Sequence, residues 1–483
     1  MKQEPHYDRQ TCNVFNKFTS LVLLAVFLLL VVVLLGVFLL VVPSTEVVPS
    51  EDMESRFLVK TLPGFLGDLP ITLETGYIGV GESEEVQLFY YFIESEGNPE
   101  KDPLMLMLSG GPGCSGLAKV LAETGPFTFN YASSSSKKPI LEINPYSWTK
   151  VGSIISLDQP AGTGFSYAET SNAYTTNDTL SAIQVYQFLR KWLVDHPNFL
   201  KNPLYVCGDS YAGLVVPMIV QEIYNGNEVG EGPHMNINGY VIGNAVTDTN
   251  DEYNSRIPFA HRLALLSDEI YVSAKENCFG EYLNVDPNNS LCINDLQVVD
   301  KCLERIKMEH VLEPNCDTSI AVKGCPDNKS KYLSAWANRR DVQKALHIRE
   351  ESKDAKWVPC NESLKFYYDK EPISYTHNVL SNVAYHQHLA SKNCRALVYS
   401  GDHDMVVPYL STLNWIKSLN LLVVNAWRPW FVDQQVAGYN RKYSYHDYNL
   451  TFATVKGGAH TVPDNKPKES LSMLMKWLVD DAL

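Results

Sequence analysis

Basic residues are scarce in this chain, and they do not gather into a patch. Lysine and arginine number 40 against 55 aspartates and glutamates, which leaves a formal net charge of −15 over 483 residues. Basic residues adjoin one another only in pairs such as Lys137-Lys138 and Arg339-Arg340. Proteins that bind nucleic acid carry basic patches that neutralise phosphate groups. The composition therefore predicts no nucleic-acid partner.

The sequence also lacks Cys-x-x-Cys pairs and internal repeats. Zinc sites commonly use cysteine pairs at that spacing, so no metal is expected. Hydrophobic residues make up 45% of the chain, which is enough for one large domain or two ordinary ones.

Charge is absent from residues 21–42, a hydrophobic run near the N-terminus. A bilayer-spanning helix needs roughly 20 such residues, whereas the hydrophobic part of a signal peptide has about 7–15. Lys2, Arg9 and Lys17 precede the run and acidic residues follow it, so the positive-inside rule places the tail in the cytosol. We predict an uncleaved signal anchor, with a long cleaved signal peptide as the alternative. Either one sends the main domain into the secretory pathway.

These features divide the chain into a cytosolic tail at 1–20, a membrane anchor at 21–42, a linker at 43–56 and a main domain at 57–483. An exported domain also fits the ten cysteines, because disulfides form in that compartment. Five Asn-x-Ser/Thr sequons are candidate glycosylation sites. They lie at Asn177, Asn288, Asn328, Asn361 and Asn449.

Several short apolar runs end in a Gly-rich or Asp-rich turn, and such runs predict buried strands of a mostly parallel sheet. They occupy residues 104–108, 153–160, 204–207, 239–244, 396–404 and 452–460. Helical periodicity lies between them, as in 179–197. Strands that alternate with helices predict an α/β fold with a doubly wound sheet.

The alternation stops at about 250–370, where cysteine and charge increase and 296–313 has a helical pattern. We predict a helical cap inserted here over the edge of the sheet. Five cysteines crowd into the segment and suggest local disulfides. They are Cys278, Cys292, Cys302, Cys316 and Cys325.

Reactive side chains lie in the turns just past three predicted strands: Ser210, Asp404 with Asp402 beside it, and His460. Ligands of open α/β sheets bind at the carboxyl ends of the strands, where these residues would meet. The chain order Ser…Asp…His is that of α/β-hydrolases. The combination predicts an α/β-hydrolase fold with Ser210, Asp404 and His460 as a catalytic triad.

Each residue also has a simpler interpretation. Ser210 sits in a Gly-rich turn, His460 could be a loop histidine, and Asp404 could cap a helix that begins near Pro408. His403 is a rival base, but it lies between two aspartates in one turn. Three suitable residue types in the right order, each just past a strand, favour catalysis over these separate readings.

The predicted roles follow from the chemistry of serine nucleophiles. His460 would take the proton of Ser210 and later give it to the leaving group, while Asp404 fixes the imidazole tautomer. The oxyanion needs backbone N–H donors, one of which would come from Tyr211. The Gly-rich turn 109–114 would supply the second donor, because glycines let the backbone approach a substrate. No metal or organic cofactor is required.

Beyond these features, the chain resembles the serine carboxypeptidase family over roughly residues 57–483. The matching motifs are SGGPGCSG (109–116), ETGP (123–126), NPYSW (144–148), LDQPAGTGFSY (157–167), GDSYAG (208–213), GNAVTD (243–248), YSGDHDMVVP (399–408) and GGAHTVPDNKP (457–467).

The resemblance implies the same triad, with the Gly111 and Tyr211 N–H groups as the oxyanion hole. It also implies three disulfides, and it leaves Cys207, Cys302 and Cys394 without an assigned partner. The implied pairs are Cys114–Cys360, Cys278–Cys292 and Cys316–Cys325.

Departures from the peptidase pattern concern the substrate site, which the resemblance places at Ser109, Gly110, Glu123 and Asp209. Peptidases of the family use Asn and Glu at the positions of Ser109 and Asp209 to hold a free carboxylate. Only Glu123 is retained here. The two shorter side chains are characteristic of the plant acyltransferase branch, as are NSRIPFAH (254–261), NVDPNNSLC (284–292), WRPW (427–430) and VAGYNRKY (436–443).

The resemblance therefore implies an acyltransferase that moves an acyl group from a 1-O-β-glucose ester to an acceptor alcohol in plant specialised metabolism. It would work in the secretory lumen, most naturally the vacuole, with the membrane as a partner through residues 21–42. A serine carboxypeptidase active at acidic pH is the second hypothesis. A membrane-tethered binding protein without catalytic activity is the third.

Overall fold

A computed structural model describes residues 56–134, 139–316, 329–353, 356–364, 375–480 and 483. The predicted tail, membrane anchor and almost all of the linker lie outside these residues. Within them, no helix has the combination of length and hydropathy that crossing a bilayer requires. The description below concerns the unit Ser55–Leu483.

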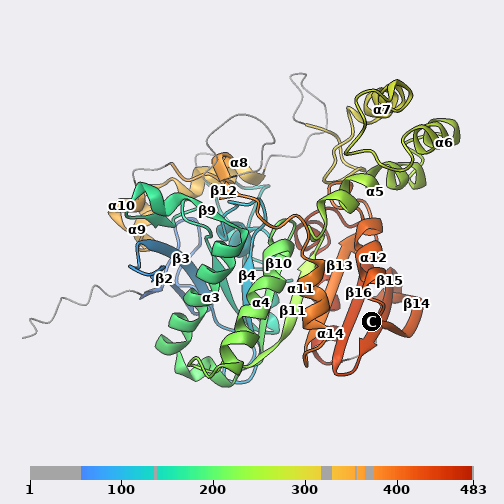
Figure 1. The fold of residues 1–483 in the computed structure, drawn as a ribbon. Helices are drawn as coiled ribbons and strands as arrows, with labels where there is room; N and C mark the ends of the chain where they lie inside the picture. The colour runs from blue at the N-terminus through green and yellow to red at the C-terminus, as the bar shows by residue number, and fades with distance from the viewer. Residues whose placement is uncertain (1–55, 135–138, 317–328, 354–355, 365–374, 481–482) are drawn as a thin grey trace, which may run out of the picture. The chain divides into compact units, whose positions relative to one another are not determined.

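Twelve strands of the described residues form one mixed sheet (Figure 1). Its order is β1-β2-β3-β7-β4-β10-β11-β13-β16-β15-β14, and β8 pairs with β3. The strands are β1 Arg56–Val59, β2 Leu73–Val80, β3 Val86–Ile93, β4 Leu104–Leu108, β7 Ser153–Leu157, β8 Tyr167–Ala168, β10 Leu204–Asp209, β11 Ile237–Gly243, β13 Arg395–Gly401, β14 Leu422–Val432, β15 Gln435–Tyr445 and β16 Tyr448–Val455. Two small sheets pair β5 Phe127–Phe129 with β6 Leu141–Ile143, and β9 Thr176–Asn177 with β12 Tyr375–Thr376.

The centre of the large sheet, from β7 through β4, β10, β11 and β13 to β16, is parallel. Every residue of β4, β7 and β10 is buried, as expected of strands covered on both faces. Because these strands run in one direction, their carboxyl ends meet at one edge. The predicted α/β fold with a mostly parallel sheet is therefore confirmed.

Helices cover both faces of the sheet. Helices α3, α4, α11 and α12 pack on one face through a core that includes Leu106, Val206 and Val398. Helix α14 packs on the other face, where Met107 and Leu397 point. The bounds are α2 Leu117–Leu121, α3 Asp178–Asp195, α4 Ala212–Glu228, α11 Val383–Leu389, α12 Tyr409–Ser418, α13 Val462–Asn465 and α14 Pro467–Leu478.

The region predicted as a helical cap consists of two parts. Figure 1 shows α6 and α7 on an extension that stands away from the sheet, beyond α5. Helices α8 and α9 instead join a separate core with β2, β3 and α2. The bounds are α5 Thr249–Arg262, α6 Asp268–Asn277, α7 Ser290–Leu303, α8 Lys329–Ala337, α9 Arg340–Ala345 and α10 Glu350–Lys353.

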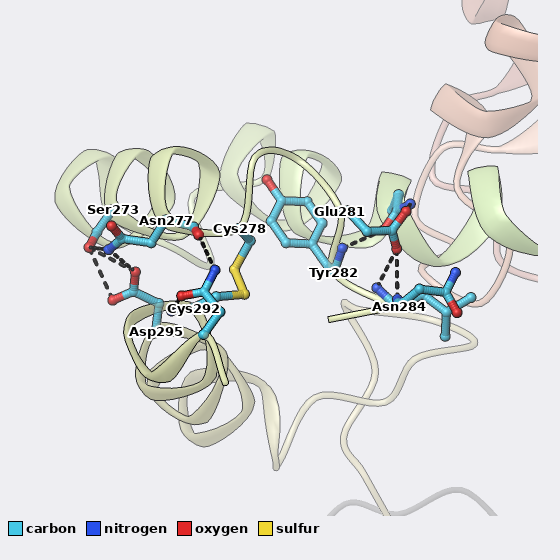
Figure 2. Close-up of a disulfide and its surroundings, with 11 residues drawn as sticks. Ser273, Asn277, Cys278, Glu281, Tyr282, Asn284, Cys292 and Asp295 are labelled. Atoms are coloured by element: carbon cyan, nitrogen blue, oxygen red, sulfur yellow. Dashed lines mark hydrogen bonds between the residues drawn. A yellow bond between two sulfur atoms is a disulfide. The ribbon is translucent and has the colours of Figure 1, made fainter. Parts of the chain in front are cut away.

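A disulfide links the two helices of the extension. Cys278 at the end of α6 bonds to Cys292 in the first turn of α7, as the resemblance implied (Figure 2). Beside it, Asp295 accepts hydrogen bonds from Ser273 and Asn277, at 3.0 and 2.7 Å. These contacts bind the helices to each other far from the carboxyl edge of the sheet, so the disulfide is a local staple.

The helix predicted at 296–313 is too long, because α7 ends at Leu303. The chain beyond it forms backbone hydrogen bonds with the loops at the carboxyl edge of the sheet. Met405 N–H donates to the Met308 carbonyl at 2.9 Å, and Val311 N–H donates to the His403 carbonyl at 3.1 Å. These long-range bonds replace the intrahelical bonds that the local pattern predicted.

Candidate active site

Ser210 occupies a sharp turn between strand β10 and helix α4. Its φ is +53°, a left-handed conformation that non-glycine residues rarely adopt. Neighbouring chain holds it there, because Ser210 N–H donates to the Gly243 carbonyl at 3.0 Å and its own carbonyl accepts from Val246 at 2.9 Å. Strain of this kind marks positions that the fold over-determines, and here it lifts the hydroxyl out of the strand.

The three residues predicted as a triad lie in one hydrogen-bonded line. Nε2 of His460 is 2.8 Å from Oγ of Ser210, and Nδ1 is 2.8 Å from Oδ2 of Asp404. The carboxylate of Asp404 is fully buried, whereas the imidazole is partly exposed. A hydroxyl, a base within hydrogen-bond reach and an acid that orients the base are the parts that nucleophilic catalysis needs.

The local environment of Asp404 excludes the simpler interpretation that this residue caps the helix after Pro408. Helix α12 begins after Pro408 without a side-chain cap, so Asp404 does not cap it. Its oxygens instead accept from the Val406 N–H at 2.8 Å and from the side-chain amide of Asn244 at 2.7 Å. The rival base His403 turns to Asp402, 2.6 Å away.

The imidazole of His460 lies among carboxylates. Burial disfavours its charged form, but the carboxylates of Asp404, Asp209 and Glu309 together outweigh burial, so the pKa of His460 is raised. Glu309 comes from the segment after α7, where its carbonyl accepts from the His460 N–H at 2.8 Å. Asp209, next to the nucleophile, therefore acts on the base, which favours the imidazolium that forms during acyl transfer.

The predicted oxyanion donors border the site. Gly110 presses against the serine turn, because a Cβ placed on it would lie 2.7 Å from Cβ of Ser210 and 2.9 Å from Tyr211 N. Among the described residues, neither the Gly111 nor the Tyr211 N–H donates to a protein acceptor. Two available N–H groups beside a nucleophile suit a developing oxyanion.

Tyr211 is anchored through its ring. Its hydroxyl donates to the buried Asp178 at the start of α3 and lies 3.0 Å from Nδ1 of His377. Tyr375 also donates to Asp178, at 2.9 Å. These bonds fix the side chain of the residue whose backbone N–H is predicted as an oxyanion donor.

A disulfide fastens the Gly-rich turn, as the resemblance implied. Cys114 bonds to Cys360, which is 246 residues further along the chain. Asn361 N–H also donates to the Gly113 carbonyl, at 2.9 Å. Cys316 is in a disulfide, and its predicted partner Cys325 lies outside the described residues. The free cysteines among the described residues are Cys207, Cys302 and Cys394.

Two cavities meet at the Gly-rich turn, and Gly111 lines both. The first, of about 440 Å³, contains Ser210 and His460 and carries many polar groups. The second, of about 230 Å³, is lined by Tyr211, by apolar side chains such as Leu214 and Val246, and by charged ones such as Arg256. A bound acyl group with its carbonyl at Gly111 and Tyr211 would have one cavity on either side.

The predicted substrate residues Ser109, Glu123 and Asp209 all line the larger cavity. Ser109 donates to the Ser115 carbonyl at 3.3 Å. Asp209 lies 2.7 Å from Nζ of Lys119, which also pairs with Glu123. Sequence reasoning missed Lys119, although its position four residues before Glu123 suits an ion pair on one helix face.

Comparison with known proteins identifies the family of this chain. The serine carboxypeptidase family matches residues 63–480. The chain belongs to the serine carboxypeptidase family. Serine carboxypeptidase-like 17 of Arabidopsis thaliana is 48% identical, over 88% of this chain and 94% of that protein. Serine carboxypeptidase-like 1 of the same plant is also 48% identical, over 89% and 93%.

A solved structure of the family has the same fold. It is a prohormone-processing carboxypeptidase from Saccharomyces cerevisiae, with a TM-score of 0.72 and 21% identity over 88% of this chain and 96% of that one. At this identity the likeness concerns the fold alone. The likeness agrees with the α/β-hydrolase fold described above for this chain.

The sequons differ in their surroundings. Asn288 and Asn449 are exposed, whereas Asn177 and Asn361 are half-buried. The side chain of Asn177 caps α3 by accepting from Leu180 at 2.9 Å, and Asn361 donates to the Gly162 carbonyl at 2.9 Å. Asn328 lies outside the described residues. Glycosylation stays a prediction for all five, with Asn288 and Asn449 the most accessible of the described ones.

Proposed function

We propose that this family member is an acyltransferase that moves an acyl group from a 1-O-β-glucose ester to an acceptor alcohol. In this reaction Oγ of Ser210 attacks the ester carbonyl, and its proton passes to Nε2 of His460. The bond between the carbonyl carbon and the anomeric oxygen breaks, and His460 returns the proton to that oxygen. Free glucose leaves, and the acyl group remains on Ser210.

The second half of the reaction uses the same groups. His460 takes the proton of the acceptor alcohol while the alcohol oxygen attacks the acyl-serine carbonyl. The bond to Ser210 then breaks, and its oxygen recovers the proton from His460. The N–H groups of Gly111 and Tyr211 would stabilise the oxyanion in both halves.

The observation that carries the proposal is the state of the two shortened side chains in the larger cavity. Ser109 donates to a backbone carbonyl, and Asp209 is paired with Lys119. Neither is poised to donate a hydrogen bond to a free carboxylate, which a carboxypeptidase must recognise. The smaller cavity has Leu214, Val246 and Leu380 in its wall, which offer apolar contacts to an aromatic or other apolar acyl group.

One observation favours the carboxypeptidase alternative. Burial raises the pKa of Glu123 to about 7, although the charge of Lys119 opposes this rise. A protonated Glu123 could donate to a peptide carboxylate at acidic pH. This alternative predicts peptidase activity that falls as the pH rises through about 7.

We also propose that the reaction takes place in the lumen of the secretory pathway. The disulfides Cys114–Cys360 and Cys278–Cys292 suit an oxidising compartment. The vacuole and the membrane anchor at 21–42 remain predictions. N-terminal sequencing of the mature protein would decide between an anchor and a cleaved signal peptide.

A substrate panel tests the proposed function. Purified full-length protein is incubated with glucose esters of aromatic acids, with and without alcohol acceptors, and separately with blocked dipeptides. Mass spectrometry should find acyl transfer that requires the ester, and Ser210→Ala should abolish it. Rapid dipeptide cleavage without transfer from any ester would overturn the proposal in favour of the peptidase. A fluorophosphonate probe should label wild type but not Ser210→Ala. This result would exclude the hypothesis of a binding protein without catalytic activity.

A further inference from the structure

Lys119 is a buried cation in the wall of the cavity beside Ser210. It belongs to α2, the short helix that follows the Gly-rich turn, and only 3% of its side chain is exposed. Its Nζ lies 2.7 Å from Oδ2 of Asp209 and also pairs with Oε2 of Glu123. We call these three residues the charged bridge.

The charged bridge keeps Lys119 charged. Burial alone would disfavour the ammonium, but Asp209 and Glu123 outweigh it and raise the pKa of Lys119. A buried charge is tolerated when it is paired and hydrogen-bonded in this way. The cation therefore persists at every pH at which the enzyme would work.

Each member of the charged bridge keeps some hydrogen-bonding capacity for a ligand. An ammonium has three N–H donors, and Lys119 uses two of them on the carboxylates. In the part of the chain that the structure describes, no donor contacts Oδ1 of Asp209 or Oε1 of Glu123. The wall of the cavity thus offers one donor between two acceptors.

The charges of this cavity do not favour an anion. In the part of the chain that the structure describes, its lining carries Lys119 and the triad base His460 against four acidic side chains, those of Glu123, Asp209, Glu309 and Asp464. A free carboxylate would meet repulsion from these groups. An uncharged sugar would not, and its vicinal hydroxyls both donate and accept, as the mixed lining requires.

We propose that Lys119 is a specificity-determining residue: through the charged bridge it makes the cavity bind the hydroxyls of a neutral sugar and reject a free carboxylate. This inference rests on the proposed function, because it assigns the glucose of the donor to the larger cavity. In a peptidase, protonated acids in this cavity would donate hydrogen bonds to the carboxylate of a peptide. Here Lys119 and its two partners would instead form hydrogen bonds with sugar hydroxyls. Asp209, and Glu123 above its pKa of about 7, serve as acceptors rather than as donors.

Ligand binding to the full chain tests the inference without relying on turnover. Ligand-detected NMR on the Ser210→Ala protein at pH 8, where Glu123 is ionised, compares methyl β-D-glucopyranoside with N-acetylphenylalanine. We expect the glucoside to bind at least tenfold more tightly. Adding Lys119→Met should remove at least tenfold of this preference. Lys150→Met is the matched control, because Lys150 lies on the surface with its Nζ 3.1 Å from Glu96, and it should leave the preference unchanged.

A second variant covers misfolding of Lys119→Met, which leaves two buried carboxylates without a cation. The triple variant Lys119→Met, Asp209→Asn, Glu123→Gln has no charge in the bridge and similar side-chain volumes, and it should also lose the preference. Tighter binding of N-acetylphenylalanine by Ser210→Ala itself, or an unchanged preference in either folded Lys119 variant, would overturn the inference. Failure of wild type to use any glucose ester would instead overturn the proposed function, whatever these affinities are.

Discussion

Asn244 donates a hydrogen bond of 2.7 Å to Oδ2 of Asp404, the same oxygen that lies 2.8 Å from Nδ1 of His460. Asn244 follows strand β11 directly, with a φ of +43°, and its side-chain oxygen accepts from Gly401 N–H at 3.1 Å. It thus ties the ends of two neighbouring strands and places the acid beneath the base.

We expect Asn244→Gly to lower kcat/KM about tenfold or more, because a hydrogen bond to a charged group contributes roughly 1.5–3 kcal/mol. Glycine keeps the left-handed backbone. Asn244→Ala should lose similar activity and, in addition, about 1–2 kcal/mol of unfolding free energy, since alanine resists positive φ. Initial rates and thermal unfolding distinguish the two effects. Unchanged activity in Asn244→Gly would show that Asp404 needs no such support.

The pH profile should report the raised pKa of His460. The base must be neutral to accept the proton of Ser210, so kcat/KM should fall as the pH drops through the pKa of His460, at a value above the ordinary 6.5. Glu309→Gln removes one of the charges that raise this pKa, so the acid limb should move to lower pH by a fraction of a unit. Glu304→Gln, which lies exposed before the same segment, is the control. An acid limb that Glu309→Gln does not move would contradict this electrostatic role.

The triad could be predicted from the sequence because each member lies within five residues of the carboxyl end of a strand, β10, β13 or β16. Buried parallel strands have a clear apolar signature, and geometry then brings their carboxyl ends together. The predicted run 104–108 coincides with β4, and the helix predicted at 179–197 coincides closely with α3 Asp178–Asp195. Most of the candidate site could therefore be predicted from the types of residue that follow the strands.

The remainder of the site depends on contacts between distant segments, which no local pattern encodes. The segment after α7 looked helical but instead lies along the active-site loops, where Glu309 faces the base. Lys119 is one lysine in a five-residue helix. Only its contact with Asp209, 90 residues further along the chain, indicates a role in the site. Pairings such as Cys114–Cys360 likewise came from family resemblance and not from spacing.

Gly110→Ala should nearly abolish activity without unfolding the protein. The added methyl would lie 2.7 Å from Cβ of Ser210 and 2.9 Å from the Asp209 carbonyl, and backbone cannot move aside cheaply. A displacement of about 1 Å in a catalytic group can cost roughly 100-fold in rate. We expect slower fluorophosphonate labelling of Ser210 by about that factor. Gly232→Ala, where a methyl meets no heavy atom within 4 Å, should label normally. Normal labelling of Gly110→Ala would show that the turn has more room than its contacts imply.

The two described disulfides should separate catalysis from stability. Cys114 lies in the Gly-rich turn, lines the larger cavity and is bonded to Cys360. Replacing both by alanine frees the turn that carries the Gly111 N–H, so kcat should fall at least tenfold, because a mobile donor stabilises the oxyanion poorly.

Replacing Cys278 and Cys292 by alanine is the matched comparison, because this pair joins α6 and α7, neither of which lines the larger cavity. Their separation is 14 residues, and closing a loop of about 15 residues stabilises a protein by roughly 3 kcal/mol. The melting temperature should fall while kcat stays near wild type at temperatures where the variant is folded. Equal losses of kcat in the two double variants would mean that the Cys114–Cys360 bond acts through global stability alone, and the assignment of the Gly111 N–H to the oxyanion hole would lose its support from this bond.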